Sequence, residues 1–210
     1  MINYHHTFKR LLDLVVASVL ALIFLPVWLL VPLLIKLTSE GPVFFLHKRV
    51  GQNGREFMMF KFRTMVNNAD EILYQEQPEL LKKFKENDWK LEMKDDPRIT
   101  PIGRVLRALT IDEFPQLINV FRGEMSMIGP RAYIRRELNE QLKKYPQTKK
   151  YLKVILTAKP GITGVWQTSG RNEISFDKRT KLDAQYVKEM SLWNDLKILF
   201  KTPKAMISKW

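Results

Sequence analysis

The sequence predicts a mostly helical α+β protein with an N-terminal re-entrant membrane helix, a small β-hairpin and amphipathic interfacial helices. Three observations predict this fold class: an uncharged apolar stretch from Leu14 to Ile35, strong turn residues from Gly51 to Gly54, and helical patterns through the second half of the chain. We expect a re-entrant membrane hairpin over residues 1–40. We expect a second part over residues 41–210, with an insertion at 67–98.

Composition excludes several kinds of site. The chain of 210 residues is long enough for one ordinary domain, and 45% of its residues are hydrophobic, so a packed core is expected. It has no cysteine, which excludes disulfides, thiolate catalysis and thiolate zinc sites. With only three histidines, any catalytic metal is expected to be a hard cation on carboxylates, such as Mg²⁺.

The charge of the chain is strongly positive and unevenly spread. The formal net charge is +13, yet the segment from Asp70 to Asp96 has nine acidic residues against five lysines. The rest of the chain therefore attracts polyanions, which could be nucleic acid, anionic lipid or phosphorylated substrates. Composition alone does not choose among these.

The apolar stretch from Leu14 to Ile35 is long enough to cross a bilayer as a straight helix. A cleaved signal peptide fits poorly, because the apolar core is too long and no small-residue cleavage pattern follows; a buried soluble helix is the other alternative. Pro26 predicts a kink near Leu25-Pro26. The segment is flanked on both sides by basic residues: Lys9, Arg10, Lys36, Lys48 and Arg49. Because basic flanks stay in the cytoplasm, a bent helix that enters and leaves by one face is favoured over a spanning helix.

The elements after the membrane segment follow from turn residues and periodicity. Val43–Leu46 and Phe57–Phe62 are predicted to pair as a hairpin around the Gly51–Gly54 turn. The negatively charged insertion is interpreted as a solvated, helix-prone excursion. Five segments are predicted to be helical, the first of them as a short basic helix or loop: Thr100–Leu109, Asp112–Arg122 ended by Gly123, Ala132–Tyr145, Asp177–Met190 and Trp193–Trp210. Pro160–Gly164 is interpreted as a loop. The last helix is basic and flanked by tryptophans, which suits a membrane interface, although a docked C-terminal helix has the same pattern.

The first cluster that could do chemistry is Asp112-Glu113-Phe114-Pro115. Proline is tolerated in the first helical turn, so the sequence predicts a helix start at Asp112, with Asp112 as its N-cap. A capping role alone would explain this pattern. However, a helix N-terminus binds phosphate, and Arg104 and Arg107 lie just upstream to hold phosphate oxygens. One carboxylate could attack phosphorus while the other holds Mg²⁺.

Two further clusters could contact phosphate or a nucleobase. Gly129-Pro130-Arg131 fixes a turn that projects a guanidinium group, although a solvated surface arginine has the same sequence. Lys61 and Arg63 are two residues apart on the second predicted strand and should point to the same side of it. An edge strand protected by charge is the alternative for this pair.

Five motifs occur in order along nearly the whole chain. They are Lys61–Met65, Asp112–Leu117, Gly123–Arg131, Lys159–Gln167 and Leu182–Val187. Together they resemble the bacterial sugar transferase family, the monotopic polyprenyl-phosphate phosphoglycosyl transferases. The insertion that ends in Asp95-Asp96-Pro97-Arg98 is similar to that of the galactose- and glucose-1-phosphate transferases.

The resemblance implies an initiating step of glycoconjugate or exopolysaccharide synthesis at the bacterial inner membrane. It implies a monotopic enzyme with a cytoplasmic catalytic domain at the membrane interface, where sugar-1-phosphate passes from a UDP-sugar to polyprenyl (undecaprenyl) phosphate through a phosphoryl-aspartate. It also implies Mg²⁺, membrane phospholipids as partners, and no nucleic acid. The implied catalytic residues are Asp112 as the nucleophile, Glu113 and Arg107, with Glu113 and Asp112 toward the metal. The implied substrate-binding residues are Lys61, Arg63, Arg104, Pro130, Arg131 and Asp183, with Pro130-Arg131 on the uridine nucleotide.

Two other readings of the same residues lead to different functions. A basic membrane-associated module that binds nucleic acid or lipid would use Asp112 and Glu113 only as helix caps. A phosphohydrolase could form the same aspartyl phosphate and pass it to water. The sequence does not specify the sugar, the polymer or the oligomeric state.

Overall fold

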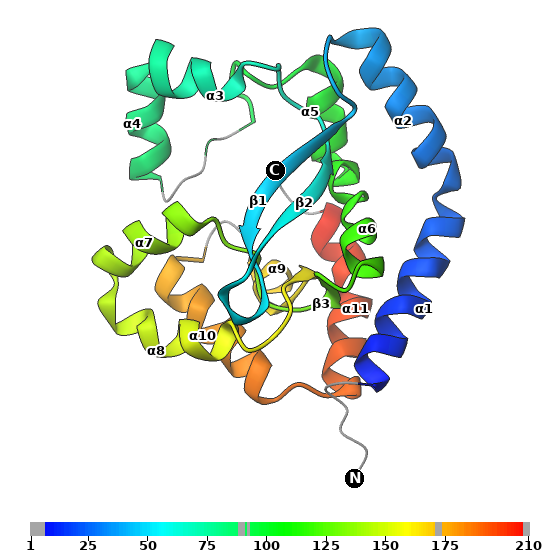
Figure 1. Cartoon of the computed structure of the whole chain (residues 1–210), viewed down its shortest axis with the longest axis vertical. Helices are drawn as coiled ribbons and strands as arrows, with labels where there is room; N and C mark the ends of the chain where they lie inside the picture. The colour runs from blue at the N-terminus through cyan, green and yellow to red at the C-terminus, as the bar shows by residue number, and fades with distance from the viewer. Residues whose placement is uncertain (1–6, 88–90, 92, 171–173, 208–210) are drawn as a thin grey trace.

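The computed structural model describes residues 7–87, 91, 93–170 and 174–207, and it shows a mostly helical α+β fold with two small sheets (Figure 1). The described helices are α1 (Phe8–Ile23), α2 (Leu25–Thr38), α3 (Ala69–Glu71), α4 (Pro78–Glu86), α5 (Pro101–Ala108), α6 (Gln116–Phe121), α7 (Arg135–Lys144), α8 (Lys149–Ile155), α9 (Val165–Thr168), α10 (Phe176–Lys188) and α11 (Leu192–Ile207). The strands are β1 (Phe44–Val50), β2 (Glu56–Phe62), β3 (Ser126–Ile128) and β4 (Gly161–Thr163).

The helices α1 and α2 form a bent pair along one edge of the molecule (Figure 1). They meet at 63° across Phe24, and Pro26 lies in the first turn of α2, where a missing amide hydrogen leaves no intrahelical bond unmade. The predicted kink near Leu25-Pro26 is confirmed. In the described part of the chain no single helix has the length and apolar character needed to cross a membrane, whereas α1 and α2 taken together do.

Large apolar side chains are exposed along both helices of the bent pair. Leu22, Leu29 and Leu37 are 74%, 68% and 73% exposed, far more than a core helix allows. The same face includes Leu11, Val15, Val19, Ile23, Leu25, Leu30, Leu33 and Leu34. Only a few positions, such as Ala17, Val31 and Ile35, are buried against the rest of the chain. The pair therefore presents a wide apolar surface that the described residues leave uncovered.

The hairpin of β1 and β2 is confirmed: β1 begins one residue later than predicted and continues to Val50, and β2 begins one residue earlier than predicted. The strands are antiparallel, and the register pairs Phe45 with Lys61 and His47 with Met59. The turn between them uses the left-handed backbone of Asn53 (φ 57°) and Gly54 (φ 74°), which asparagine and glycine adopt at little cost.

The segment Pro160–Gly164, predicted as a loop, contains a strand instead. Residues Gly161–Thr163 form β4, which pairs in parallel with β3 in the register Ser126↔Gly161 and Ile128↔Thr163. A side chain at Gly129 would come within 2.6 Å of the Gly161 nitrogen, so this close approach requires glycine. A strand this short leaves no periodic signal, and its pairing depends on a partner far away in sequence.

The helix predicted over Asp112–Arg122 is also shorter than expected. Residues Ile111–Glu113 form a 3₁₀ turn, and α6 begins only at Gln116, so Asp112 is not its N-cap. Pro115 cannot donate to the Ile111 carbonyl, which accepts from the Phe114 nitrogen instead (3.1 Å) and tightens the turn. Gly123 ends the segment with φ 76°, as predicted.

The remaining predicted helices are present with shifted ends. The segment Thr100–Leu109 is helical as α5, and α7, α10 and α11 correspond to the other three. The insertion forms α3, a π-helical turn over Ile72–Glu76, and α4, with Leu73 almost fully buried. Residues 1–6 of the predicted membrane hairpin and residues 208–210 of the last predicted helix lie outside the described residues. So do residues 88–90 and 92 of the insertion.

Candidate functional site

The candidate site is a cavity of about 810 Å³ between the β-hairpin, the segment that joins α5 to α6, and the insertion. Its lining brings together six predicted site residues that are far apart in the sequence: Lys61, Arg63, Arg107, Asp112, Glu113 and Arg131. Both polar and aromatic side chains line it, including Phe44, Phe45 and Trp166. A cavity of this volume fits a ligand as large as a nucleotide sugar.

Lys61 lies between the two adjacent carboxylates. Its Nζ atom is 2.7 Å from Oε1 of Glu113 and 3.5 Å from Oδ2 of Asp112. Lys61 comes from β2, whereas the carboxylates belong to the 3₁₀ turn. The tightened turn presents Asp112 and Glu113 to the same ammonium group, and Thr110 enters this turn in the left-handed conformation (φ 57°). The motif therefore lies in a constrained backbone rather than at a regular helix start.

Asp112 is the most buried of the groups around the carboxylate pair, with 6% of its surface exposed. Burial raises the pKa of its carboxyl group above the usual value, and the neighbouring Glu113 raises it further, whereas Lys61 and Arg107 lower it. A desolvated carboxylate is a better nucleophile than a hydrated one, and the neighbouring cations favour its ionised form. The arrangement can therefore support carboxylate attack on an electrophilic phosphorus.

Arg107 reaches the cavity from α5 and is oriented by Thr64, since its Nε donates to the Thr64 Oγ1 at 2.9 Å. Burial lowers the pKa of Arg107, and the Asp112 carboxylate raises it. Gly103 on the same helix packs directly against the Thr64 carbonyl, where any side chain would overlap the backbone. This contact sets the distance of α5 from the end of β2, and so the reach of Arg107.

The other two predicted basic residues are placed differently. Arg63 is buried and its Nη2 donates to both the carbonyl and the Oγ of Ser39 (2.8 Å each), so it fastens the end of α2 to the hairpin while it lines the cavity. Arg104 is exposed on α5 and is not among the residues that line the cavity. Geometry supports Arg107, and not Arg104, as the α5 contact to a phosphate in this cavity.

The Pro130-Arg131 turn is held from behind by Asp183 on α10. The Asp183 Oδ2 atom accepts from the Arg131 backbone nitrogen at 3.1 Å, and the Pro130 carbonyl accepts from Gly161 at 2.9 Å. The Arg131 guanidinium carbon lies 4.9 Å from the centre of the Trp166 ring. Asp183 is fully buried, and this burial raises its pKa to about 7. Asp183 is therefore a positioning residue for the turn, since it does not line the cavity itself.

Several residues of the site were not predicted from the sequence. His47 and Arg49 line the cavity from β1, on the same side of the hairpin as Lys61. Asp96 and Arg98 form a buried bidentate pair at the end of the insertion, with 2.6 Å between Arg98 Nη2 and Asp96 Oδ2. His47 and Arg49 follow Phe45 at every second position of a strand, and this alternation could have indicated that both are site residues. The insertion thus contributes to the wall of the cavity as well as forming a solvated excursion.

The carboxylate pair can be compared with the needs of a metal ion. Among the described residues, no group of three or more histidine, cysteine or acidic side chains is arranged to hold a metal. Asp112 and Glu113 provide two hard oxygen donors, which is a common protein share for Mg²⁺ when substrate phosphates and water complete the shell. The donor set fits a magnesium ion that arrives with a phosphorylated substrate.

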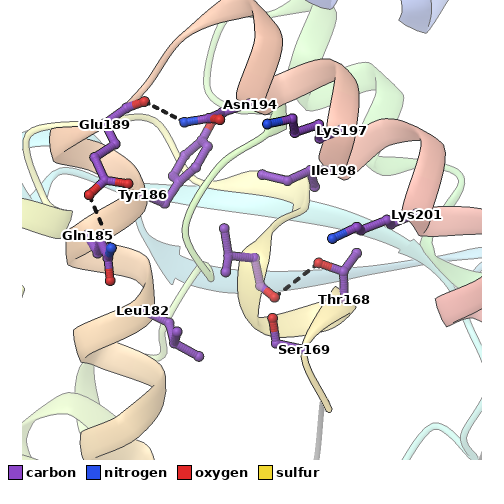
Figure 2. A pocket seen from close by; sticks show the side chains of 11 residues that line it. Thr168, Ser169, Leu182, Gln185, Tyr186, Glu189, Asn194, Lys197, Ile198 and Lys201 are labelled. Atoms are coloured by element: carbon purple, nitrogen blue, oxygen red, sulfur yellow. Dashed lines mark hydrogen bonds between the residues drawn. The ribbon is translucent and has the colours of Figure 1, made fainter.

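A second, smaller cavity of about 320 Å³ lies between α9, α10 and α11 (Figure 2). Lys197 and Lys201 extend over it from α11, opposite Gln185 of α10 and Glu189 just after that helix, which are hydrogen-bonded to each other at 3.1 Å (Figure 2). It shares no lining residue with the larger cavity. The predicted site residues therefore converge on the larger cavity.

Comparison with known proteins identifies the family of the chain. The profile of the bacterial sugar transferases matches residues 4–209. The chain is 41% identical to the exopolysaccharide production protein ExoY of Rhizobium meliloti, over 94% of this chain and 84% of that protein. It is also 41% identical to the undecaprenyl-phosphate galactose phosphotransferase of Salmonella typhimurium, over 96% of this chain but only 40% of that protein. It is 35% identical to the UDP-glucose:undecaprenyl-phosphate glucose-1-phosphate transferase of Caulobacter vibrioides, over 95% of this chain and 70% of that protein.

The match covers the segments that line the cavity, from the bent helix pair through the carboxylate turn to α11. Both the family profile and the match to ExoY span the segments that contribute Lys61, Asp112 and Arg131. These comparisons, together with the geometry of the carboxylates and their basic neighbours, show that the chain belongs to the bacterial sugar transferase family.

Proposed function

We propose that the protein transfers sugar-1-phosphate from a UDP-sugar to polyprenyl phosphate, with Asp112 as the covalent nucleophile. The single observation that carries the proposal is the buried Asp112 carboxylate, held beside Lys61, Glu113 and Arg107 in a cavity of nucleotide-sugar size. The relatives from Salmonella and Caulobacter are named for transfer of galactose phosphate and glucose phosphate to undecaprenyl phosphate, which supports the same reaction class here.

The first half of the proposed reaction forms an acyl phosphate. A carboxylate oxygen of Asp112 attacks the sugar-linked phosphorus of the UDP-sugar, and the bond from that phosphorus to the bridging oxygen breaks. UMP leaves with the bridging oxygen and its electron pair. Lys61 and Arg107 place positive charge beside the phosphoryl oxygens, because two negative groups would otherwise repel each other.

The second half regenerates the enzyme. A phosphate oxygen of polyprenyl phosphate attacks the same phosphorus, and the bond from phosphorus to Asp112 breaks with return of the carboxylate. The product is a polyprenyl diphosphate sugar. No general base is required, because the attacking phosphate is already ionised near neutral pH.

Mg²⁺ is part of the proposal, with Glu113 and Asp112 as its protein ligands. When bound, the ion would offset the charge of the pyrophosphate and stabilise the leaving UMP. Lys61 contacts both carboxylates in the structure, and its ammonium group would balance the negative charge of the phosphoryl oxygens. Turnover is expected to stop with a chelator and to return with added Mg²⁺.

The bent pair of α1 and α2 is proposed to be a re-entrant membrane hairpin, with the rest of the chain on the cytoplasmic face of the inner membrane. Its exposed leucines provide the apolar surface, and the exposed Trp193 and Phe200 on α11 suit the interface. The uridine nucleotide is proposed to lie toward Arg131 and Trp166. Such a site would let a water-soluble donor and a lipid phosphate meet at one carboxylate.

Mass spectrometry of the intact protein with a panel of UDP-sugars tests the proposal. A mass gain of one sugar phosphate, located on Asp112, is expected with the matching donor. Asp112→Asn should give no adduct and no turnover, whereas Asp95→Asn, which alters an exposed carboxylate, should behave as the unmodified protein. If the Asp112→Asn protein still makes lipid-linked sugar at the normal rate, the proposal is wrong.

Omission of the acceptor separates transfer from hydrolysis. A phosphohydrolase would release free sugar phosphate from the UDP-sugar without polyprenyl phosphate. A transferase should stop at the aspartyl intermediate with one equivalent of UMP. A module that only binds nucleic acid or lipid would release no UMP under either condition.

A further inference from the structure

His47 is a polar residue of the cavity for which the proposed reaction has no role so far. It stands on β1 opposite Met59 in the register, two pairs along from Phe45 and Lys61. Because directly paired residues project from the same side of a hairpin, His47, Arg49 and Lys61 share one face, and all three line the cavity. His47 therefore lies between the carboxylate end of the cavity and Arg49.

The hydrogen bond between His47 and Arg49 fixes the tautomer of the imidazole. The Arg49 Nη2 atom lies 3.1 Å from His47 Nδ1, and a guanidinium group can only donate. Nδ1 is therefore the acceptor, so the single ring proton of a neutral imidazole is on Nε2. Arg49 is itself held in place, because its Nη1 donates to the Ala132 carbonyl at 3.0 Å.

The surroundings keep His47 neutral. Burial and the positive charges of Arg49, Lys61 and Arg131 lower its pKa to about 3. Protonation would also require a second N–H to point at the Arg49 guanidinium group. His47 is thus a fixed neutral donor over the physiological pH range, and it cannot act as a general acid or base there. Among the described residues, no protein group is hydrogen-bonded to its Nε2 atom.

We propose that His47 is a specificity-determining residue, whose Nε2–H donates to a hydroxyl group of the donor hexose. The inference rests on the proposed function, since it names a contact within the same cavity. The phosphates of the donor need cations, which Lys61, Arg107 and Arg131 provide. A neutral N–H instead matches an uncharged oxygen, and hydroxyl groups are the uncharged oxygens that differ between hexoses.

Distance favours the hexose over the nucleotide as the partner. Successive register pairs on one face are separated by two residues, or about 7 Å along the strand. The hexose is joined directly to the phosphorus that Asp112 attacks, and Lys61 contacts Asp112 at 3.5 Å. A hydroxyl group of the hexose ring is therefore within reach of a side chain two register pairs along from Lys61.

The experiment compares kcat/KM for the preferred UDP-hexose and for its monodeoxy analogues in the full protein with His47 and with His47→Ala. Loss of one neutral hydrogen bond should lower kcat/KM of His47→Ala with the preferred donor about tenfold. One monodeoxy analogue should show the same loss with the unmodified protein, and His47→Ala should not distinguish that analogue from the parent donor. His47→Gln, which keeps a side-chain N–H, should recover part of the loss. Lys48→Ala, on the opposite face of β1, is the matched control and should have no effect.

The outcomes separate this inference from the proposed function. Turnover of a UDP-hexose by the unmodified protein tests the reaction itself. Absence of turnover would count against the proposed function and not against the His47 contact. Inhibition by UMP should be the same in His47→Ala and the unmodified protein, because UMP has no hexose. Equal losses with every deoxy analogue would overturn the hexose contact. Weaker UMP inhibition in His47→Ala would place the contact on the nucleotide, and a changed pH profile of kcat/KM would indicate a proton-transfer role; either result also overturns it.

Discussion

The Lys61 ammonium group lies 2.7 Å from the Glu113 carboxylate, although the two residues come from different elements of the fold. The same nitrogen is 3.5 Å from Asp112, so one lysine contacts both acidic residues of the site. This contact joins the β-hairpin to the 3₁₀ turn that carries the proposed nucleophile. Under the proposed function, it makes the hairpin part of the catalytic machinery and not only a scaffold.

Removal of the Lys61 charge should therefore impair chemistry more than folding. Lys61→Met is expected to lower kcat by about 10²–10³-fold, the usual loss when a preorganised charge at a reacting centre is removed. Lys61→Arg keeps the charge and should retain more activity than Lys61→Met. Steady-state kinetics with a matched UDP-sugar measure this. Equal activity of Lys61→Met and the unmodified protein would contradict the role.

The orientation of Arg107 by Thr64 gives a second prediction. Thr64→Val keeps the volume of a buried side chain but removes the acceptor at 2.9 Å from Arg107 Nε. A less ordered guanidinium group should raise KM for the UDP-sugar by about five- to tenfold, consistent with the loss of one charged hydrogen bond. Thr157→Val, at an exposed threonine, serves as the control. An unchanged KM in Thr64→Val would show that Arg107 does not need this anchor.

The raised pKa of Asp183 predicts that the stability of the folded protein depends on pH. Its pKa is about 7 in the folded protein and 3.8 ordinarily. Between these values the folded state holds a proton that the unfolded chain has released, so this residue lowers stability as pH rises from about 4 to 7. The full cost, present above about pH 7, is roughly 4 kcal/mol at most.

The measurement is thermal unfolding of Asp183→Asn and the unmodified protein from pH 5 to pH 8. Asparagine keeps an acceptor for the Arg131 nitrogen and cannot ionise, so its Tm advantage should grow with pH and level off above about pH 7. Asp177→Asn is the control on the same helix, because hydrogen bonding to Ser175 lowers the pKa of that half-buried carboxyl. Its Tm difference should be constant across this range. A constant difference for Asp183→Asn would contradict the prediction.

The buried ion pair between Lys9 and Asp195 should hold α1 to α11. The Lys9 Nζ atom is 2.6 Å from Asp195 Oδ2, and the Tyr186 hydroxyl is 2.6 Å from Oδ1 of the same carboxylate. Lys9→Met would leave a buried carboxylate without its cation, which should cost about 3–5 kcal/mol of unfolding free energy. Denaturant unfolding in detergent measures this loss.

Two further variants test whether charge is the cause. Lys9→Met combined with Asp195→Leu should recover part of the lost stability, because neither charge of the pair remains buried. Lys48→Ala breaks the exposed contact to Glu56 (2.8 Å) and should change stability little. A double variant less stable than Lys9→Met alone would show that packing, and not the unpaired charge, explains the loss.

The membrane proposal is testable by cysteine labelling, because the chain has no native cysteine. Thr7→Cys and Glu40→Cys place single thiols at exposed positions on either side of the bent pair. With a membrane-impermeant maleimide, both should react in inside-out vesicles and neither in right-side-out vesicles. Asp95→Cys, outside the helix pair, should follow the same pattern. If Thr7→Cys and Glu40→Cys react from opposite faces, the pair spans the membrane and is not re-entrant.

The sequence by itself determined the features that depend on neighbouring residues. The kink at Pro26, the turn at Asn53-Gly54, the helix end at Gly123 and the amphipathic helices all follow from local backbone preferences and periodicity. The ordered motifs likewise identified the carboxylate pair and the family. Local rules failed at Asp112. Pro115 was correctly expected near a helix start, but it tightens the turn before α6, so Asp112 lies in a 3₁₀ turn and is not the N-cap.

Only the tertiary structure decided which of these side chains meet. Lys61 reaches Asp112 across 51 positions of sequence, and Asp183 reaches the Arg131 nitrogen across 52. Arg104 and Arg107 look alike in the sequence, yet packing of Gly103 against Thr64 turns only Arg107 into the cavity. The tautomer of His47 also depends on a strand geometry that places Arg49 beside it. Such contacts result from the packing of whole elements, which no local pattern in the chain encodes.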